Sequence, residues 1–255
     1  MTVPFDGDAV GAIVRSVAAD VRDLRERSGV EIVTDGPEGP TTSGDVQAQA
    51  ALVEQLLTGF GPAGITAEEG GYRRTVVADP FAPLTWIIDP LDGTSAYLSG
   101  ADTYGVQVAA YGNGRLLGGW ISCPDLGWHV SAWEGGPLLV EGVEQSGLSA
   151  RTLIADGDFD DAHLASLARR NVSGYARTRS CAAEYALVTA GLLDTAMYHR
   201  THPWDHAPGA YLVRRAGGRS IRWNGDAYDP GVPGKGILSV SVAADLDAAK
   251  ERLLV

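Results

Sequence analysis

The sequence predicts a mixed α/β fold, and three observations support this prediction. The N-terminal part contains two stretches with the apolar spacing of amphipathic helices. Short alternating segments joined by tight turns follow between about 104 and 140, a pattern typical of an antiparallel sheet. After about Val143, strands alternate with helices. A chain of 255 residues suits two closely packed halves, and we predict an N-terminal α+β half over residues 1–143 and a C-terminal α/β half over residues 144–255.

Two helices are expected before the first strand. The first spans residues 6–27, and its inward face is apolar at every third or fourth position: Val10, Ile13, Val14, Val17 and Val21. Residues 36–44 are rich in Gly, Pro, Ser and Thr, which favours a loop. Asp45 then stands where a helix N-cap residue stands, and the second helix is expected to run to about Leu57.

The central part of the chain predicts an antiparallel meander. Residues 86–88 form a short apolar run that ends in Asp89-Pro90, which indicates a buried strand that delivers Asp89 at its end. Residues 104–111 alternate like a strand, Gly112-Asn113-Gly114 predicts a tight turn, and residues 115–122 form the returning strand. Residues 128–133 and 137–140 are interpreted as two further strands.

The C-terminal part predicts alternating strands and helices. Strands are expected over residues 152–155, 195–198, 219–223 and 237–242. Helices are expected over residues 161–170, 181–192, 204–216 and 245–253, and Gly217-Gly218 marks the end of the third of them.

The charge and composition of the chain limit the partners and the location that we expect for it. The formal net charge of −12 repels polyanions, so we predict no nucleic-acid and no membrane partner. Residues 1–10 lack the basic and apolar regions of a signal peptide, and no apolar run is long enough to cross a bilayer. Cys123 and Cys181 lie far apart and match no zinc spacing, which favours two reduced thiols. We therefore expect a cytoplasmic protein.

Acidic residues in four places carry the candidate chemistry. They are the pair Glu68-Glu69, the motif from Asp89 to Asp92, Asp205 and Asp45. Two carboxylates that meet in one cleft repel each other and raise each other's pKa, and a divalent cation between them removes that penalty. Oxygen ligands favour a hard ion, so Mg²⁺ is predicted and Mn²⁺ is its natural substitute.

Gly93-Thr94-Ser95 follows the second carboxylate directly. A glycine-containing helix start offers backbone N–H groups that bind phosphate well. Each motif has an ordinary alternative, because Asp is common in turns and at caps and adjacent Glu residues are usually solvated. Metal ligands and a phosphate cradle within six residues nevertheless suit phosphoryl transfer to water.

The strings around these residues resemble a known family. Residues 86–95, Trp-Ile-Ile-Asp-Pro-Leu-Asp-Gly-Thr-Ser, closely resemble the first signature of the inositol monophosphatase family. Residues 204–210, continuing to Arg215-Ala216-Gly217-Gly218, resemble its second signature. Ala67-Glu68-Glu69 and Thr42-Ser43-Gly44-Asp45 are similar to two supporting elements, in the same order. The resemblance implies a five-layer α/β/α/β/α sandwich, often assembled as a homodimer.

The resemblance also implies a role for each matching residue. Glu68, Asp89 and the carbonyl of Leu91 would hold one Mg²⁺, and Asp89, Asp92 and Asp205 a second. Thr94 would orient the attacking water with Asp45 as its acidic partner. Glu69, the third catalytic residue, would support a metal-bound water at a third, weaker metal site. The N–H groups of Gly93 and Thr94, continued by Ser95, would hold the phosphate.

Three departures from the family's pattern fall in the part of the site that would bind the alcohol portion of the substrate. No Lys lies near residues 33–35, Arg179-Ser180-Cys181-Ala182 replaces Gly-Ser/Thr-Ala-Ala, and Tyr198 replaces an acidic residue. We therefore place Arg179, Ser180 and Tyr198 among the substrate-binding residues. Arg179 could contact a second anionic group of the substrate or pair with a local acid. The predicted substrate is a small inositol-, sugar- or histidinol-phosphate-like ester. The alternatives are a 3′-phosphoadenosine nucleotide and a non-catalytic metal or phosphate sensor.

Overall fold

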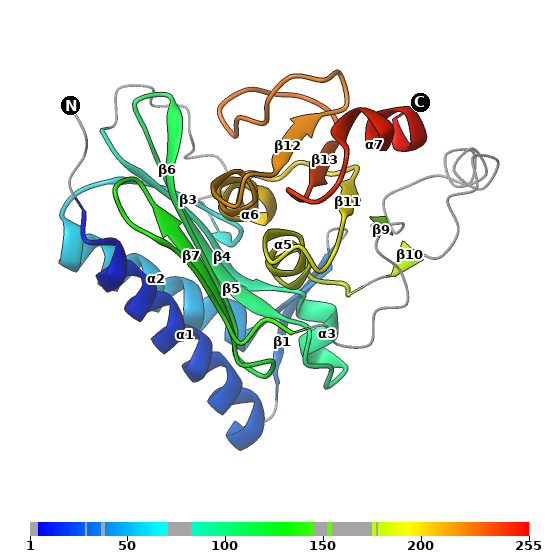
Figure 1. Ribbon diagram of the computed structural model, residues 1–255. Helices are drawn as coiled ribbons and strands as arrows, with labels where there is room; N and C mark the ends of the chain where they lie inside the picture. Colours follow the sequence, from blue (N-terminus) through cyan, green and yellow to red (C-terminus); the bar gives the residue numbers. More distant parts are fainter. Residues whose placement is uncertain are drawn as a thin grey trace.

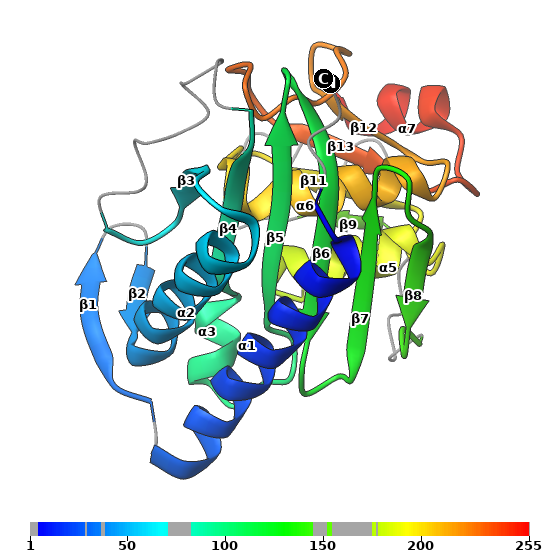
Figure 2. The same ribbon diagram turned by 90° about the vertical axis from the view of Figure 1, so that its left-hand side faces the viewer.

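The chain forms five layers, in agreement with the predicted sandwich (Figure 1). The computed structural model describes residues 5–28, 30–36, 39–70, 83–144, 152–154, 175–176 and 178–254. A helical pair, a six-stranded sheet, a second helical pair, a five-stranded sheet and a terminal helix follow one another. Figure 2 shows the first helical pair lying across one face of the six-stranded sheet.

The outer helical layer consists of α1 (Gly7–Ser28) and α2 (Ser43–Phe60). The apolar stripe of α1 packs against the sheet as its spacing predicts, and Val10, Val14 and Val17 have no exposed surface. Leu52 and Leu56 of α2 are buried in the same cluster, together with Trp86 from the sheet. Burial of these side chains positions the N-terminal end of α2 beside the end of the central strand.

The six-stranded sheet has the order β3-β4-β5-β6-β7-β8. Its strands are β3 (Gly64–Ala67), β4 (Thr85–Asp92), β5 (Gly105–Gly112), β6 (Arg115–Cys123), β7 (Trp128–Trp133) and β8 (Leu138–Glu141). β3 pairs with β4 in parallel, and all later neighbours are antiparallel, which confirms the predicted meander. Asn113 and Gly114 have φ of 52° and 72°, so the β5–β6 turn needs residues that tolerate positive φ.

The middle helical layer is built from α5 (Cys181–Thr189) and α6 (Pro203–Arg215). These helices pack together and against the six-stranded sheet, and α6 also touches β12 and β13. The approach is close at Gly209, where any Cβ would lie 1.9 Å from the ring of Tyr185. The helices therefore share one apolar core with both sheets.

The five-stranded sheet has the order β10-β9-β11-β13-β12. Its strands are β9 (Thr152–Ile154), β10 (Tyr175–Ala176), β11 (Thr195–Tyr198), β12 (Arg219–Arg222) and β13 (Ile237–Val240). The last helix, α7 (Leu246–Leu253), buries Ala249 and Leu253 against this sheet, and Asp245 is its N-cap. The predicted helix over residues 161–170 lies outside the described residues.

Several predicted boundaries are wrong for identifiable reasons. Residues 36–44 are not one loop, because β1 (Ile32–Gly36) and β2 (Gly39–Thr42) form a hairpin that leads directly into α2. The N-cap of α2 is Thr42 rather than Asp45. β4 continues past Asp89 to Asp92, followed by α3 (Thr94–Leu98). Among the described residues, no helix combines the length and apolar character needed to span a bilayer.

Candidate active site

The predicted metal-binding carboxylates converge where the ends of β3 and β4 meet the start of α6. Glu68 directly follows β3, and its N–H donates to the carbonyl of Ile88 in β4 at 3.3 Å. Asp89 and Asp92 lie on β4, and Asp205 lies in the first turn of α6. The charges of Glu68, Asp92 and Asp205 all raise the pKa of Asp89, so these carboxylates lie close to that of Asp89.

A β-bulge in β4 explains how Asp89 and Asp92 reach the same side. Residues three positions apart point to opposite faces of a regular strand. Asp89 pairs with Gln107 and Asp92 with Gly105, so β4 contains one residue more than β5 over this stretch. The extra residue reverses the alternation, and the N–H of Leu91 donates to Oδ1 of Asp89 at 3.2 Å. The bulge also accommodates Pro90, which has no N–H for the ladder.

Burial makes the negative charges of this cluster costly. Asp89 is 1% exposed and Asp92 is 8% exposed. Burial raises the pKa of Asp92 to about 6, and burial together with Asp45, Glu69 and Asp92 raises that of Glu68 to about 8. A set of buried oxygen donors that repel one another fits a hard divalent cation, which would stabilise their ionised forms.

Asp92 is held by the start of α5. The hydroxyl of Ser180, the N-cap residue of α5, donates to Oδ2 of Asp92 at 2.5 Å. The N–H of Ala182 donates to the same oxygen at 2.8 Å. These hydrogen bonds oppose the rise in the pKa of Asp92, but burial outweighs them. Ser180, predicted to bind substrate, thus contacts a candidate metal ligand.

Two buried glutamines support the carboxylates, and sequence reasoning missed both. Gln107, which has no exposed surface, donates through Nε2 to Oδ2 of Asp89 and to the carbonyl of Asp205, both at 3.3 Å. Gln49 of α2 holds the backbone of Glu69 with a pair of hydrogen bonds, each 2.9 Å long. The feature of the sequence that could have identified them is a glutamine at an inward position of an otherwise apolar strand or helix.

Asp45 belongs both to the α2 cap and to the site. Its Oδ2 accepts from the N–H of Thr42 at 2.7 Å, which completes a capping box. Its Oδ1 accepts from the hydroxyl of Thr94 at 3.2 Å, and that hydroxyl also lies 3.0 Å from the carbonyl of Leu91. Burial raises the pKa of Asp45 to about 6. The predicted Asp45–Thr94 pairing is therefore present.

Glu69 joins the cluster from the side of α2. Oxygens of Asp45, Glu68 and Glu69 lie within 4.8 Å of one another, an arrangement that could hold a cation. The hydroxyl of Thr41 donates to Glu69 at 3.2 Å. Glu69 also lines a groove of about 680 Å³ between the β1–β2 hairpin and α2.

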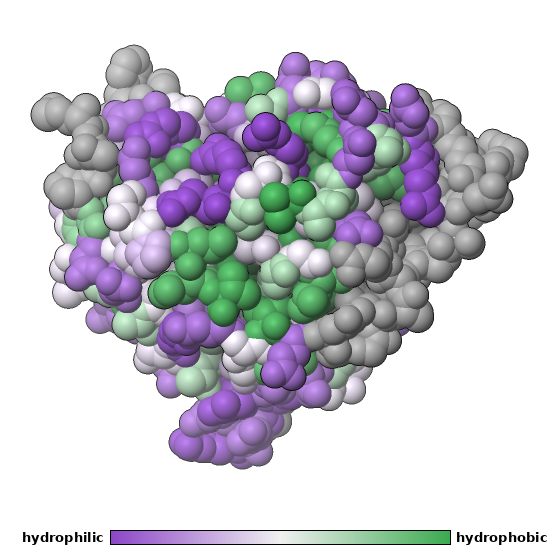
Figure 3. All heavy atoms as spheres, in the orientation of Figure 1, coloured by the Kyte–Doolittle hydropathy of each residue, from purple (hydrophilic) through white to green (hydrophobic). Residues whose placement is uncertain are grey.

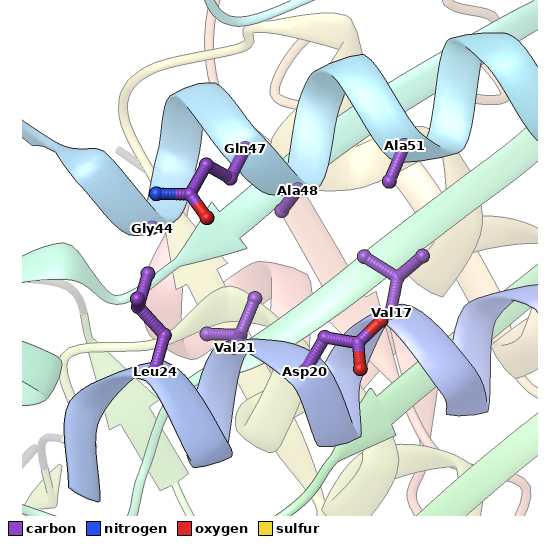
Figure 4. Close-up of a pocket in the computed structure, with 8 residues that line it drawn as sticks. All are labelled: Val17, Asp20, Val21, Leu24, Gly44, Gln47, Ala48 and Ala51. Carbon is purple, nitrogen blue, oxygen red and sulfur yellow. The ribbon is translucent and has the colours of Figure 1, made fainter. Parts of the chain in front are cut away.

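A second hollow, between α1 and α2, is separate from the site. Its volume is about 220 Å³. Figure 4 shows its lining, in which Val17, Val21 and Leu24 of α1 face Ala48 and Ala51 of α2. None of the predicted site residues lines it.

The predicted phosphate cradle lies at the start of α3. Gly93 is the N-cap, with φ of 83°, and a Cβ there would meet the carbonyl of Thr103 at 3.0 Å. Only glycine fits this combination of positive φ and close contact. The first N–H groups of a helix have no partner within the helix, so those of Thr94 and Ser95 are suitable for an anion. Ser95 is exposed at this end.

The remaining predicted substrate residues differ in exposure. Arg179 is exposed, and its φ is 62°. Tyr198 is 2% exposed and stacks on Tyr185 at 5.3 Å between ring centroids, and the ring of His206 lies 4.8 Å away. This burial in the core does not favour the predicted contact of Tyr198 with substrate. Glu184, also buried, accepts from the hydroxyl of Thr178.

The comparisons with known proteins agree with this geometry. The family model described as the inositol monophosphatase family matches residues 7–254. Phosphatase IMPL1, chloroplastic, of Arabidopsis thaliana is 27% identical over 86% of this chain and 66% of its own length, so the chain spans just under two thirds of that relative. The inositol-1-monophosphatase of Rhizobium meliloti (strain 1021) is 26% identical over 88% and 86%.

The fold is also known from solved structures. An IMPase/NADP phosphatase complexed with Mg²⁺ and phosphate superimposes with a TM-score of 0.76 at 16% identity, over 94% of this chain and 91% of that one. At that identity the likeness establishes the fold alone.

Proposed function

The chain belongs to the inositol monophosphatase family of phosphoric monoester hydrolases, and from this premise we propose that it hydrolyses a small polar phosphate monoester with bound Mg²⁺. Inositol, sugar and histidinol phosphates are the substrate types we consider. The observation that carries the proposal is the convergence of the buried Asp89 and Asp92 with the half-buried Glu68 and Asp205.

We assign the metal ligands from this cluster. Glu68, Asp89 and the carbonyl of Leu91 would hold one Mg²⁺, and Asp89, Asp92 and Asp205 a second. Glu69, within 4.8 Å of Glu68, would support a third and weaker site. Mn²⁺ has the same preference for oxygen and could substitute. When bound, such ions neutralise the phosphate and lower the pKa of water.

Asp45 and Thr94 supply the proton path in this proposal. The hydroxyl of Thr94 donates to Asp45 at 3.2 Å and can accept a hydrogen bond from a water molecule in return. Burial raises the pKa of Asp45 to about 6, close to the value that suits a general base near neutral pH. Thr94 thus orients water while Asp45 holds the proton that the hydroxyl passes on.

The start of α3 would hold the phosphate. The N–H groups of Gly93, Thr94 and Ser95 would donate to its oxygens, with the favourable end of the helix dipole behind them. Positioning and charge stabilisation account for most catalysis of phosphoryl transfer, so little further chemistry is needed from the chain.

The test is phosphate release from a panel of phosphomonoesters. The wild-type protein with Mg²⁺ should release phosphate, and chelation of the metal should abolish release. Asp92→Asn should lower kcat/KM by about a thousandfold, since a cation's charge stabilisation is worth several kcal/mol. Asp125→Asn, which changes an acid paired with Arg25 outside the carboxylate cluster, is the matched control. If no ester yields phosphate, the sensor alternative is favoured and the proposed activity is wrong.

A homodimer and a cytoplasmic location complete the proposal. β8 is an edge strand of the six-stranded sheet, and its Val140 is 40% exposed. Figure 3 shows apolar side chains gathered over the middle of the face on which β7 and α5 lie. Such a patch supports self-association. Sedimentation of the purified protein checks this, and a mass equal to one chain at assay concentration contradicts it.

A further inference from the structure

The starts of α5 and α6 bring a thiol, a carboxylate and an imidazole together. Ligand atoms of Cys181, Asp205 and His206 lie within 4.8 Å of one another. Cys181 is the first residue of α5, and the other two lie at the start of α6, the neighbouring helix of the middle layer (Figure 1). Cys181 matches no zinc spacing in the sequence, so the packing of the two helices is what unites these side chains.

Packing fixes the imidazole of His206 and leaves one of its nitrogens for a ligand. His206 is 1% exposed. A hydrogen bond of 3.2 Å joins its Nδ1 to the hydroxyl of Tyr185, whereas its buried Nε2 has no hydrogen-bond partner among the described residues. A buried polar atom without a partner is costly. Histidines that bind a metal through one ring nitrogen usually hydrogen-bond through the other, and His206 has this arrangement.

Hydrogen bonds hold Cys181 beside the carboxylates, and its side chain stays accessible. The hydroxyl of Ser180 and the N–H of Ala182, on either side of it, both donate to Oδ2 of Asp92. Cys181 is partly exposed and forms no disulfide. The pattern of the inositol monophosphatase family usually has Ala at this position. The thiol is therefore not one of the magnesium ligands that the resemblance implies.

Asp205 lies between the thiol and imidazole and the proposed magnesium ligands. Its carbonyl accepts from Nε2 of Gln107 at 3.3 Å, which holds the backbone, while its side chain is half-buried. A second imidazole is close to it, since Nδ1 of His202 lies 3.8 Å from its Oδ2. The carboxylate that we assign to the second Mg²⁺ is thus also within reach of Cys181 and His206.

The three donors suit zinc rather than magnesium. Sulfur and imidazole nitrogen favour Zn²⁺, whereas Mg²⁺ prefers oxygen alone. Three protein ligands with water or His202 in the fourth position would complete a tetrahedral site. Ligand atoms around such an ion lie roughly 3.3 to 3.6 Å apart, so these side chains must approach one another by roughly 1 Å. Cys181 and Asp205 are only partly buried, which leaves room for this movement.

We propose that Cys181, Asp205 and His206 bind Zn²⁺, and that zinc bound there inhibits the phosphatase by withdrawing Asp205 from the second Mg²⁺. The zinc site depends only on these three side chains, whereas the inhibition rests on the proposed function. Because one carboxylate serves both sites, each ion lowers the affinity of the protein for the other.

Cobalt absorption tests the site without an activity measurement. Co²⁺ occupies zinc sites, and a cobalt–thiolate bond gives a near-ultraviolet absorption band that oxygen ligands do not give. The wild-type protein should show this band on titration with Co²⁺, and added Zn²⁺ should remove it. C181A, which introduces the residue usual in the family, should lose the band. C123A, at a buried cysteine outside the cluster, is the matched control and should keep it.

Competition with a chromophoric chelator measures the Kd for Zn²⁺. C181A and H206Q should each raise this Kd by more than about 100-fold, the upper end of what loss of a group that only supports a ligand costs. H129Q, at another buried histidine, is the matched control for H206Q and should leave the Kd unchanged. Thermal unfolding checks that each variant folds, and C181A carries the test if H206Q does not fold.

Inhibition of phosphate release tests the effect of zinc on the proposed activity. With Mg²⁺ present, the zinc concentration that halves the rate should rise with the concentration of Mg²⁺. It should also be at least about tenfold higher in C181A than in the wild type, each protein being compared with its own zinc-free rate.

The outcomes distinguish this inference from the proposed function. A wild-type protein without the cobalt–thiolate band, or a band that persists in C181A, overturns the zinc site. Equal zinc inhibition of the wild type and C181A overturns the inhibition through this site. If the band behaves as expected but no ester yields phosphate, the zinc site is supported and the proposed activity is wrong.

Discussion

The buried carboxylates predict that the metal-free protein loses stability as pH rises and that Mg²⁺ restores it. Burial, then the charges of Asp45, Glu69 and Asp92, raise the pKa of Glu68 from 4.5 to about 8. The folded protein therefore keeps a proton that the unfolded chain has already released. Because the folded state binds more protons in this window, the free energy of unfolding falls as pH rises from about 4.5 to about 8.

The size of the effect follows from the same pKa difference. At about pH 7 the Glu68 carboxyl is still mostly protonated in the folded protein. The free energy of unfolding is therefore lower by about 3 kcal/mol than at pH 4.5. For a chain of this length that corresponds to a fall in Tm of roughly 6 to 12 °C. A cation at a concentration of about a hundred times its Kd would offset about 2.7 kcal/mol of this loss in the free energy of unfolding.

Thermal unfolding at about pH 5 and about pH 8, with chelator or with excess Mg²⁺, measures this effect. The increase in Tm on adding Mg²⁺ should be larger at the higher pH. Glu68→Gln should raise the metal-free Tm at high pH and reduce the response to Mg²⁺. Glu26→Gln, at an exposed position of α1, is the control and should change neither. A metal-free Tm that is constant or rises over this range refutes the electrostatic account.

Three further perturbations probe the support of the site. Thr94→Ala should lower kcat by about 10²- to 10⁴-fold without weakening Mg²⁺ binding, whereas Thr94→Ser should retain most activity; unchanged kcat contradicts its role in orienting water. Gln107→Leu should raise the Kd for Mg²⁺ by about 10- to 100-fold, measured by calorimetry, because Asp89 loses its hydrogen-bond donor. Burial and the nearby Arg15 lower the pKa of His129 to about 4, so its contribution to stability is lost as pH falls below about 6.5. Between pH 7 and pH 5, the free energy of unfolding of His129→Gln, measured in urea, should therefore rise by about 2 kcal/mol relative to that of the wild type. The same pH dependence in both proteins contradicts this prediction.

The meander and the carboxylate motifs were predictable because their signals are local. Alternation and the Asn113-Gly114 turn specify β5 and β6 within a few residues of each other. The β1–β2 hairpin was missed because its Gly, Pro and Thr residues are equally typical of loops. Its pairing is made by backbone hydrogen bonds, which leave little mark on side-chain pattern.

Roles that depend on contacts between distant segments were harder to predict. Ser180 lies 88 residues from Asp92, and its hydroxyl holds that carboxylate, a contact that the sequence does not predict. Tyr198 is predicted to bind substrate because it occupies the position at which the family usually carries an acidic residue, yet its ring packs in the core against Tyr185 and His206. Sequence spacing identified the neighbourhood of both residues, and packing decided which way each side chain points.

Asp45 shows that a structural and a chemical role need not exclude each other. A residue at the third position of a helix with a Thr cap is sufficiently explained by the capping box. Each carboxylate has two oxygens, however, and the cap uses one of them while the other accepts from Thr94. The cap thereby fixes the rotation of the carboxyl group, which a proton-accepting residue needs and which a solvated side chain would lack.

The junction between the six-stranded sheet and α6 links folding to catalysis. Asp89 and Asp92 come from the six-stranded sheet, Asp205 from α6, and Gln107 joins Asp89 to the backbone of Asp205. Charges that repel across this junction oppose its closure, and a cation between them would favour it. The helical layer between the two sheets thus acts through both of its helices, because α6 supplies Asp205 and the N-cap residue of α5, Ser180, holds Asp92.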